Sequence, residues 1–203
     1  MHQRYLLSIG FILLGALGLL LSLLGEVSDL GKYTSSDPRS WESFDQKLVD
    51  NTPDYISLQN KLDSLINQSI NQSMSEQEKM FQAYDLVTHR FTHTDEAKYN
   101  LFSNWLLWLM GKVYTPFAYI RQPEVLVNLG HSSLCSEQAY LLQTLAESQG
   151  IRTRSVGLNG HVVMEAWYDN DWHLYDPDLE VVPLLDDGRV LSLDELARSL
   201  SEN

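Results

Sequence analysis

Residues Tyr5 to Leu24 form a run of twenty residues without a charged side chain, dominated by Leu, Ile, Phe, Gly and Ala. As a helix, this run would rise about 30 Å, the thickness of a bilayer core. A cleaved signal peptide is the rival interpretation, because the run follows Arg4 near the N-terminus. Signal peptides usually have an apolar region of about 7–15 residues and a small-x-small cleavage site, which Ser22 to Gly25 does not offer. We therefore expect an uncleaved signal anchor over residues 5–24.

The charges around this run predict its orientation. Arg4 precedes it, whereas Glu26 and Asp29 follow it, so the positive-inside rule keeps residues 1–4 in the cytoplasm. The C-terminal part is then periplasmic or extracellular. Because Arg4 is the only charge in the first 24 residues of a chain with net charge −13, the remainder carries −14. So acidic a domain argues against nucleic acid and anionic lipid surfaces as partners.

The remaining residues fit one stalk and one domain. Residues 25–53 are rich in Ser, Asp, Gly and Lys and predict a stalk or linker, while residues 54–203 suffice for one domain. Capping boxes of the S-x-x-E type begin helices at Ser75 and Ser192. A further helix is indicated by an apolar stripe at helical spacing, formed by Leu58, Leu62, Leu65, Ile66 and Ile70.

Cys135 is the only cysteine, so the chain can form no internal disulfide. It precedes a helical pattern over residues 136–149 that Gly150 ends. A helix start favours a thiolate by roughly 0.3–1 kcal/mol, and a neighbouring imidazolium lowers a cysteine pKa much further. We expect both effects to lower the pKa of Cys135. Taken alone, a single cysteine is more often an inert, small apolar residue.

His161 and Asp176 supply the other two groups that a thiol nucleophile needs. Turn residues separate three predicted antiparallel strands, near residues 152–158, 162–168 and 172–175. Such a meander places the start of the second strand beside the end of the third. Asp176 could then accept a ring N–H of His161, and His161 could act as base and acid for Cys135. A loop histidine or an Asp-Pro turn alone would mean little; the ordered set favours an acyl-transfer site.

From Cys135 to Pro177 the chain resembles the transglutaminase-like superfamily of papain-fold cysteine enzymes. The resemblance rests on Cys135, Gly150 to Arg154, Gly160-His161, Glu165, Trp172 and Asp176-Pro177. It implies an α+β fold of papain/transglutaminase-like type, with Cys135 as nucleophile, His161 as base and acid, and Asp176 as orienting residue. Ser136 follows Cys135 where animal transglutaminases have Trp, and the chain is too short for their additional β-domains. Protein crosslinking is therefore not the implied reaction.

The implied function is that of a membrane-anchored cysteine hydrolase or acyltransferase that needs no cofactor and no metal. A protein or peptide at the cell envelope would be its substrate, and hydrolysis of a peptide or isopeptide bond would be its reaction. The alternative is a non-catalytic assembly or binding module that kept the fold. Compact forms with the patterns of Gly160 to Glu165 and Asp176 to Asp178 are similar to proteins associated with bacterial exopolysaccharide production, which is the pathway such a module could serve. A third possibility is a redox or disulfide-linked structural role for Cys135.

Several other segments carry weaker expectations. Residues 101–110 hold two tryptophans and predict a buried helix beside the active site, with membrane-surface or partner contact as the alternative. Residues 112–122 are expected to form a wall of the cleft. The oxyanion donor upstream of Cys135 is left open among Trp105, Trp108, Tyr119 and Gln122. Glu165 is expected to pair with Arg152 or Arg154, and His173 to be structural. Other acidic residues should form a solvated face: Asp169, Asp171, Asp176, Asp178, Glu180, Asp186 and Asp187.

Overall fold

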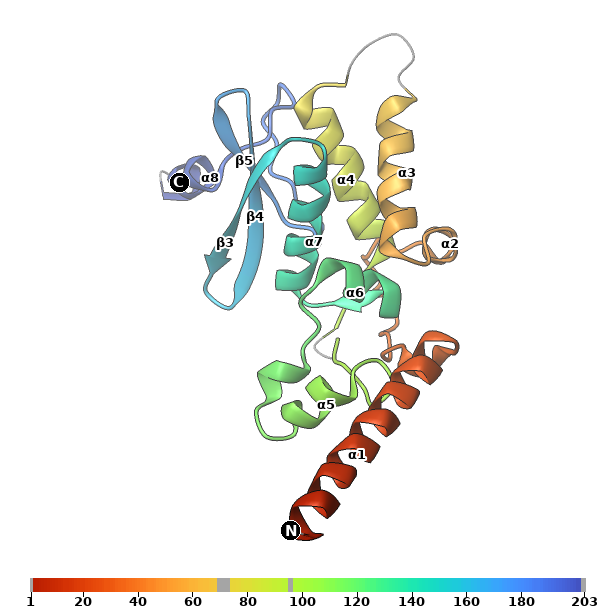
Figure 1. Cartoon of the computed structure of the whole chain (residues 1–203). Coiled ribbons are helices and arrows are strands. Elements are labelled where there is room, and N and C mark those ends of the chain that lie inside the picture. The colour runs from red at the N-terminus through yellow and green to blue at the C-terminus, as the bar shows by residue number, and fades with distance from the viewer. Residues whose placement is uncertain (1, 69–73, 95–96, 202–203) are drawn as a thin grey trace.

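A three-stranded sheet and the helices that cover it lie at one end of the structure, and one long N-terminal helix lies at the other (Figure 1). The computed structural model describes residues 2–68, 74–94 and 97–201. The helices are α1 (His2–Glu26), α2 (Gln46–Asn51), α3 (Tyr55–Asn67), α4 (Glu76–Arg90), α5 (Trp105–Gly111), α6 (Pro123–Leu129), α7 (Cys135–Ser148) and α8 (Leu193–Ser201), with 3-10 turns η1 (Asp29–Gly31) and η2 (Thr115–Ala118). The strands are β1 (Thr92–His93), β2 (Ser132–Ser133), β3 (Arg152–Leu158), β4 (His161–Tyr168) and β5 (Asp171–Tyr175).

The predicted three-stranded meander is confirmed. Strands β3, β4 and β5 pair antiparallel in that order, with Leu158 opposite His161 and Met164 opposite Tyr175. Gly160 has a φ of 82°, and Asp169 and Asn170 also have positive φ, as tight hairpin turns require. The start of β4 therefore lies beside the end of β5.

Helix α7 lies between this sheet and α4, and α3 covers the outer side of α4 (Figure 1). The fold is therefore α+β, as the sequence predicts. Its core consists of apolar side chains from all these layers, including Met80, Val87, Leu141, Leu142, Leu145, Met164, Ala166 and Tyr175. Buried apolar area of this kind is the main stabilising contribution to folding.

The local helix signals agree with the structure. Ser75 and Glu78 form a complete capping box at the start of α4, and the Ser192 amide donates to the Glu195 carboxylate before α8. Leu58 and Leu62 of α3 are fully buried. Leu65 and Ile66 pack against the same core. The last position of that stripe, Ile70, lies outside the described residues.

The segment predicted as a stalk lies along the domain. Tyr33 is buried in the core, and the Ser36 amide donates to Ser132 Oγ at 2.9 Å. Its last helix, α2, contacts α4. The division of the chain into a tip (1–4), a span (5–24), a stalk (25–53) and a domain (54–203) stays a prediction.

Arg90, the last residue of α4, is a buried cation whose guanidinium bonds backbone carbonyls. It donates to the carbonyls of Thr52, Val127 and Gly130 at 3.0–3.3 Å. Burial lowers its pKa to about 10. Thr52 caps the end of α2, Val127 lies in the last turn of α6, and Gly130 follows that helix, so Arg90 joins the predicted stalk to the end of α6 and the approach to β2.

Helix α1 is long and apolar enough to cross a membrane over Ser8–Glu26, with a mean hydropathy of 2.3. Helix α5 packs against it. The expectation that residues 101–110 form a buried helix is wrong, since none of the seven described residues of α5 is buried. Helix α5 contacts α1 and η2, Leu107 packs against the core, and other side chains such as Leu106 are exposed.

Candidate active site

Cys135 reaches its position through a short pair of parallel strands. Strand β2 pairs with β1, with His93 opposite Ser133, and the fully buried β2 leads through Leu134 into α7. Cys135 is the first residue of α7, as the sequence predicts within one residue. Amides in the first helical turn have no carbonyl partner within the helix. They can therefore stabilise negative charge that develops beside the sulfur.

His161 and Asp176 form the hydrogen bond that the hairpin predicts. Nε2 of His161, the first residue of β4, lies 2.7 Å from Oδ2 of Asp176. The other carboxylate oxygen of Asp176 accepts the amides of Asp178 and Leu179, at 3.2 and 3.1 Å. Asp176 is thus held by the backbone while it bonds to the ring. A proton on Nε2 leaves Nδ1 as the nitrogen that can accept one from the thiol.

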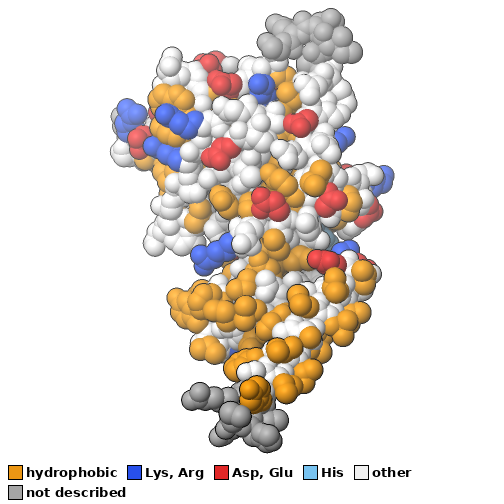
Figure 2. Space-filling model, in the orientation of Figure 1, with side chains coloured by type: hydrophobic (Ala, Val, Ile, Leu, Met, Phe, Trp, Pro, Cys, Tyr) orange, Lys and Arg blue, Asp and Glu red, His pale blue; other side chains and the backbone are white. Residues whose placement is uncertain are grey.

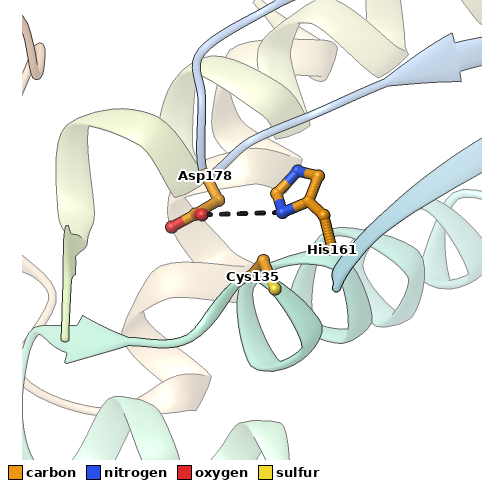
Figure 3. Close-up of side chains that lie close together, drawn as sticks. All are labelled: Cys135, His161 and Asp178. Carbon is orange, nitrogen blue, oxygen red and sulfur yellow. Dashed lines mark ion pairs between the residues drawn. The ribbon is translucent and has the colours of Figure 1, made fainter. Parts of the chain in front are cut away.

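Cys135 and His161 come together, and a second aspartate joins them (Figure 3). The sulfur of Cys135, one ring nitrogen of His161 and one carboxylate oxygen of Asp178 lie within 4.8 Å of one another. Nδ1 of His161 is 4.0 Å from Oδ2 of Asp178. The structure therefore brings together all three residues that the sequence singles out, and adds Asp178.

Asp178 corrects the expectation of a uniformly solvated acidic face. Its side chain is 4% exposed, and Oδ1 accepts hydrogen bonds from His93 Nδ1 at 2.6 Å and Gln138 Nε2 at 3.3 Å. Asp176 is also buried. The sequence Asp176-Pro177-Asp178 could have indicated this role for Asp178. Asp178 is only two residues from Asp176, and the turn there keeps it close to His161. His93 had no such signal, since it reaches the site through the β1–β2 pair.

The pKa of Cys135 differs from the expectation. Burial raises the pKa of the thiol, and the negative charges of Asp178 and Glu137 act in the same direction. The backbone amides of Val162 and Ser136 oppose them but do not prevail. The amide at the helix start lowers this pKa as expected, but burial outweighs it, so the expected net lowering is wrong and the resting site holds a thiol. A nucleophile of this kind needs a base to remove its proton during attack.

A cleft of about 540 Å³ lies at the start of α7, and Cys135 itself is not among its lining residues. Leu134 and Ser136, the two chain neighbours of Cys135, line it together with Tyr119, Arg121, Glu137 and Tyr140. Two residues of the segment 112–122, Tyr119 and Arg121, line this cleft, and the prediction that the segment forms a wall of the substrate cleft stays a prediction. Burial raises the pKa of Glu137, which the positive charge of Arg121 partly offsets. The cleft thus offers aromatic faces and one group of each charge to a bound chain.

Cys135, His161 and Asp178 could also hold a metal ion. A thiolate, an imidazole nitrogen and a carboxylate oxygen are the ligand types that zinc takes, and catalytic zinc sites have three protein ligands. The bond from His161 to Asp176 also resembles the carboxylate contact that orients metal-bound histidines. Asp178, however, already accepts two hydrogen bonds from protein groups.

No family model, no curated protein and no solved structure matches this chain. The transglutaminase-like assignment therefore rests on the motifs alone and stays a prediction. What the geometry adds is the spatial arrangement of Cys135, His161, Asp176 and Asp178.

The remaining candidates fall outside the site. Glu165 is fully buried and pairs with Arg154 at 2.6 Å, which confirms its structural interpretation. His173 is buried, with Nδ1 2.6 Å from the Val190 carbonyl oxygen, and is structural as expected. Trp105 and Trp108 line a cavity against α1. Of the four oxyanion candidates, only Tyr119 lines the cleft beside Cys135.

Proposed function

We propose that this chain is a membrane-anchored, transglutaminase-like cysteine enzyme that forms an acyl-enzyme on Cys135. The observation that carries the proposal is the position of His161, which bonds Asp176 through Nε2 and has Nδ1 left for the thiol. A structural cysteine needs no such oriented imidazole. The favoured reaction is hydrolysis of a peptide or isopeptide bond at the cell envelope, and transfer to an amine is the variant.

In this mechanism His161 carries the proton. Nδ1 takes the proton of Cys135 while the sulfur attacks the carbonyl carbon, and the carbonyl oxygen becomes an oxyanion. The backbone amide of Cys135 stabilises that oxyanion. The imidazolium then protonates the leaving amine, the carbon–nitrogen bond breaks, and a thioester remains. Water attacks the thioester with Nδ1 as base, which releases a carboxylic acid and restores the thiol.

Asp176 keeps the ring in the required tautomer and stabilises the imidazolium. Asp178 adds a second negative charge beside the ring, and the same charge raises the pKa of the thiol. Both carboxylates stabilise the imidazolium that forms when the proton moves from sulfur to nitrogen, whereas the charge of Asp178 opposes the thiolate that forms with it. Arg121 in the cleft can bind a negative group of the substrate.

One observation favours the alternative of a non-catalytic assembly or binding module, including one linked to exopolysaccharide production. The raised pKa of Cys135 is what a buried, inert thiol would show. The two functions differ in whether His161 activates the sulfur.

Acetyl transfer from p-nitrophenyl acetate tests this difference. The purified full chain in detergent should gain the mass of one acetyl group, on Cys135, as its thioester forms. Cys135→Ser should gain none at that position, and His161→Ala should react at least about 100-fold more slowly, because the general base is lost. His89→Ala removes a histidine on α4, which bonds the Asp85 carbonyl instead, and serves as the matched control.

Equal acetylation of wild type and His161→Ala, with both variants folded by circular dichroism, would overturn the proposal. The same reaction after treatment with a zinc chelator distinguishes a free nucleophile from a cysteine that binds zinc. A nucleophile acts with or without the chelator, whereas a thiolate bound to zinc becomes reactive only after the metal is removed.

A further inference from the structure

Helix α5 and turn η2 expose a continuous group of large apolar side chains. We call this group the apolar platform. It lies beside α1, where hydrophobic side chains dominate the surface in Figure 2. The exposed fraction of its members runs from 36% at Met110 to 92% at Val113. The platform consists of Leu106, Leu109, Met110, Val113, Tyr114 and Phe117.

Charge is almost absent from this stretch of an acidic chain. Between Leu101 and Ile120 the only charged residue is Lys112. Its ammonium lies 4.9 Å from the ring centroid of Trp108, the distance of a cation–π contact. Tryptophan and long basic side chains are both suited to a level where apolar surface meets a polar phase. A surface that faced water throughout would carry more charge.

Helix α5 is fixed at a definite level along α1. Trp105, Trp108 and Leu109 line a purely apolar cavity together with Leu14 and Leu17. A methyl group added at Gly18 would overlap the indole of Trp105. Gly18 therefore permits this close contact, and the contact sets the height of α5.

That height lies within the apolar part of α1. Gly18 is eight residues from Glu26, the polar end of the apolar segment, which is roughly 12 Å along a helix. Half of a bilayer core is about 15 Å thick. If α1 spans a membrane, α5 must enter the hydrocarbon of the same leaflet that faces the domain.

The backbone of this stretch suits such an environment, in which an unpaired polar group is costly. The side-chain oxygen of Asn100 accepts the amides of Phe102 and Ser103, and that of Asn104 accepts the amide of Leu107. Near η2, the amide of Phe117 donates to the Tyr114 carbonyl. The amide of Tyr99 donates to the carbonyl of Ala118 at 2.7 Å and closes the loop at its base.

We propose that the apolar platform inserts into the outer half of the bilayer beside α1, as a second, non-spanning membrane contact. The proposal rests on the membrane anchoring by α1 in the proposed function. It has a consequence for the substrate, because Tyr119 and Arg121 follow η2 directly and line the cleft beside Cys135. The cleft is thereby held close to the membrane surface. Chains attached to, or emerging from, the membrane are the substrate class that this placement favours.

Spin labels on the full chain in phosphatidylcholine vesicles test the insertion. Single cysteines are placed on a Cys135→Ser background, and collisions with molecular oxygen and with a water-soluble nickel chelate are measured. Val113→Cys reports the platform, and Leu20→Cys reports α1 at the level of α5. Leu200→Cys, on an exposed position of α8, is the matched control for an apolar residue in water.

We expect oxygen collisions at Val113 to be comparable with those at Leu20 and severalfold more frequent than those at Leu200. Nickel collisions should show the reverse order. Frequent nickel collisions at Val113, together with frequent oxygen collisions at Leu20, would overturn the insertion of the platform but not the membrane anchoring by α1. A label at Leu20 that meets nickel would overturn the anchor and the platform together. A label at Val113 shielded from both reagents would indicate a protein partner, and would also overturn the proposal.

Discussion

The two ends of this molecule are built in opposite ways. Around Cys135, polar side chains are buried, and Asp176 and Asp178 each have several hydrogen-bond partners. Around α5, apolar side chains are exposed, and none of the seven described residues of that helix is buried. Buried polar groups require close geometric matching, whereas exposed apolar groups require a suitable solvent. The contacts within the fold therefore account for the buried polar groups around Cys135. The exposed apolar groups around α5 depend on what surrounds the protein.

The largest effect is expected for Asp176→Asn, which changes the end around Cys135 and leaves the end around α5 unchanged. The asparagine keeps an oxygen for the amides of Asp178 and Leu179 but turns a donor toward Nε2 of His161. The ring is then held in the wrong tautomer, and acetylation of Cys135 should fall by about 10²–10⁴. Mass spectrometry with p-nitrophenyl acetate measures this rate. Asp186→Asn, at an exposed position, should react like wild type, and an equal rate for Asp176→Asn would contradict the role given to that residue.

Arg90 tests the junction between the predicted stalk and the end of α6. Arg90→Met would leave the carbonyls of Thr52, Val127 and Gly130 without a buried donor. Each unsatisfied carbonyl costs about 1–3 kcal/mol, and removal of the buried charge offsets part of this, so we expect a loss of about 3 kcal/mol. Urea unfolding of the full chain in detergent measures the free energy of unfolding. Arg198→Met on α8 is the control, and a similar small change in both variants would show that Arg90 joins nothing essential.

Gly18→Ala tests the contact at the membrane end. The added methyl group would push Trp105 away from α1, which should weaken the packing of α5 by about 1–3 kcal/mol. Hydrogen exchange of the α5 amides in vesicles measures this local free energy. Gly15→Ala makes the same change on the same helix, at a position with no atom within 4 Å of the new methyl group. The prediction fails if both variants protect α5 equally.

The smallest effect concerns the charge of Asp178. Because this carboxylate helps to raise the pKa of Cys135, Asp178→Asn should lower that pKa. In wild type, thiolate forms only above the usual thiol range near pH 8.5, so alkylation by iodoacetamide should rise late with pH. The profile of Asp178→Asn should move to lower pH, while that of Asp186→Asn should stay in place. A shift toward higher pH would show that the charge stabilises the thiolate instead.

The sequence predicts best what short-range pattern determines. The meander, the start of α7 and the bond between His161 and Asp176 all follow from strands and turns within about forty residues. The capping boxes are equally local. None of these predictions depends on contacts between segments that lie far apart in the sequence.

Features that depend on distant contacts or on the environment were not predictable. His93 reaches Asp178 across 85 residues, through a strand of only two residues that has no periodicity of its own. The raised pKa of Cys135 depends on burial, which a helix-start argument does not contain. The apolar pattern of residues 101–110 fits burial in a core and exposure to lipid equally well.

The parallel pair of β1 and β2 has a consequence for the time at which this protein could become reactive. Thr92 and Ser132 are bonded across 40 residues, so the segment that leads into Cys135 is held by a contact with a distant part of the chain. Under the proposed function, the sulfur gains its base and its orienting carboxylate only when residues 161–178 have also reached their places. Chemical competence would then require both halves of the domain to be assembled.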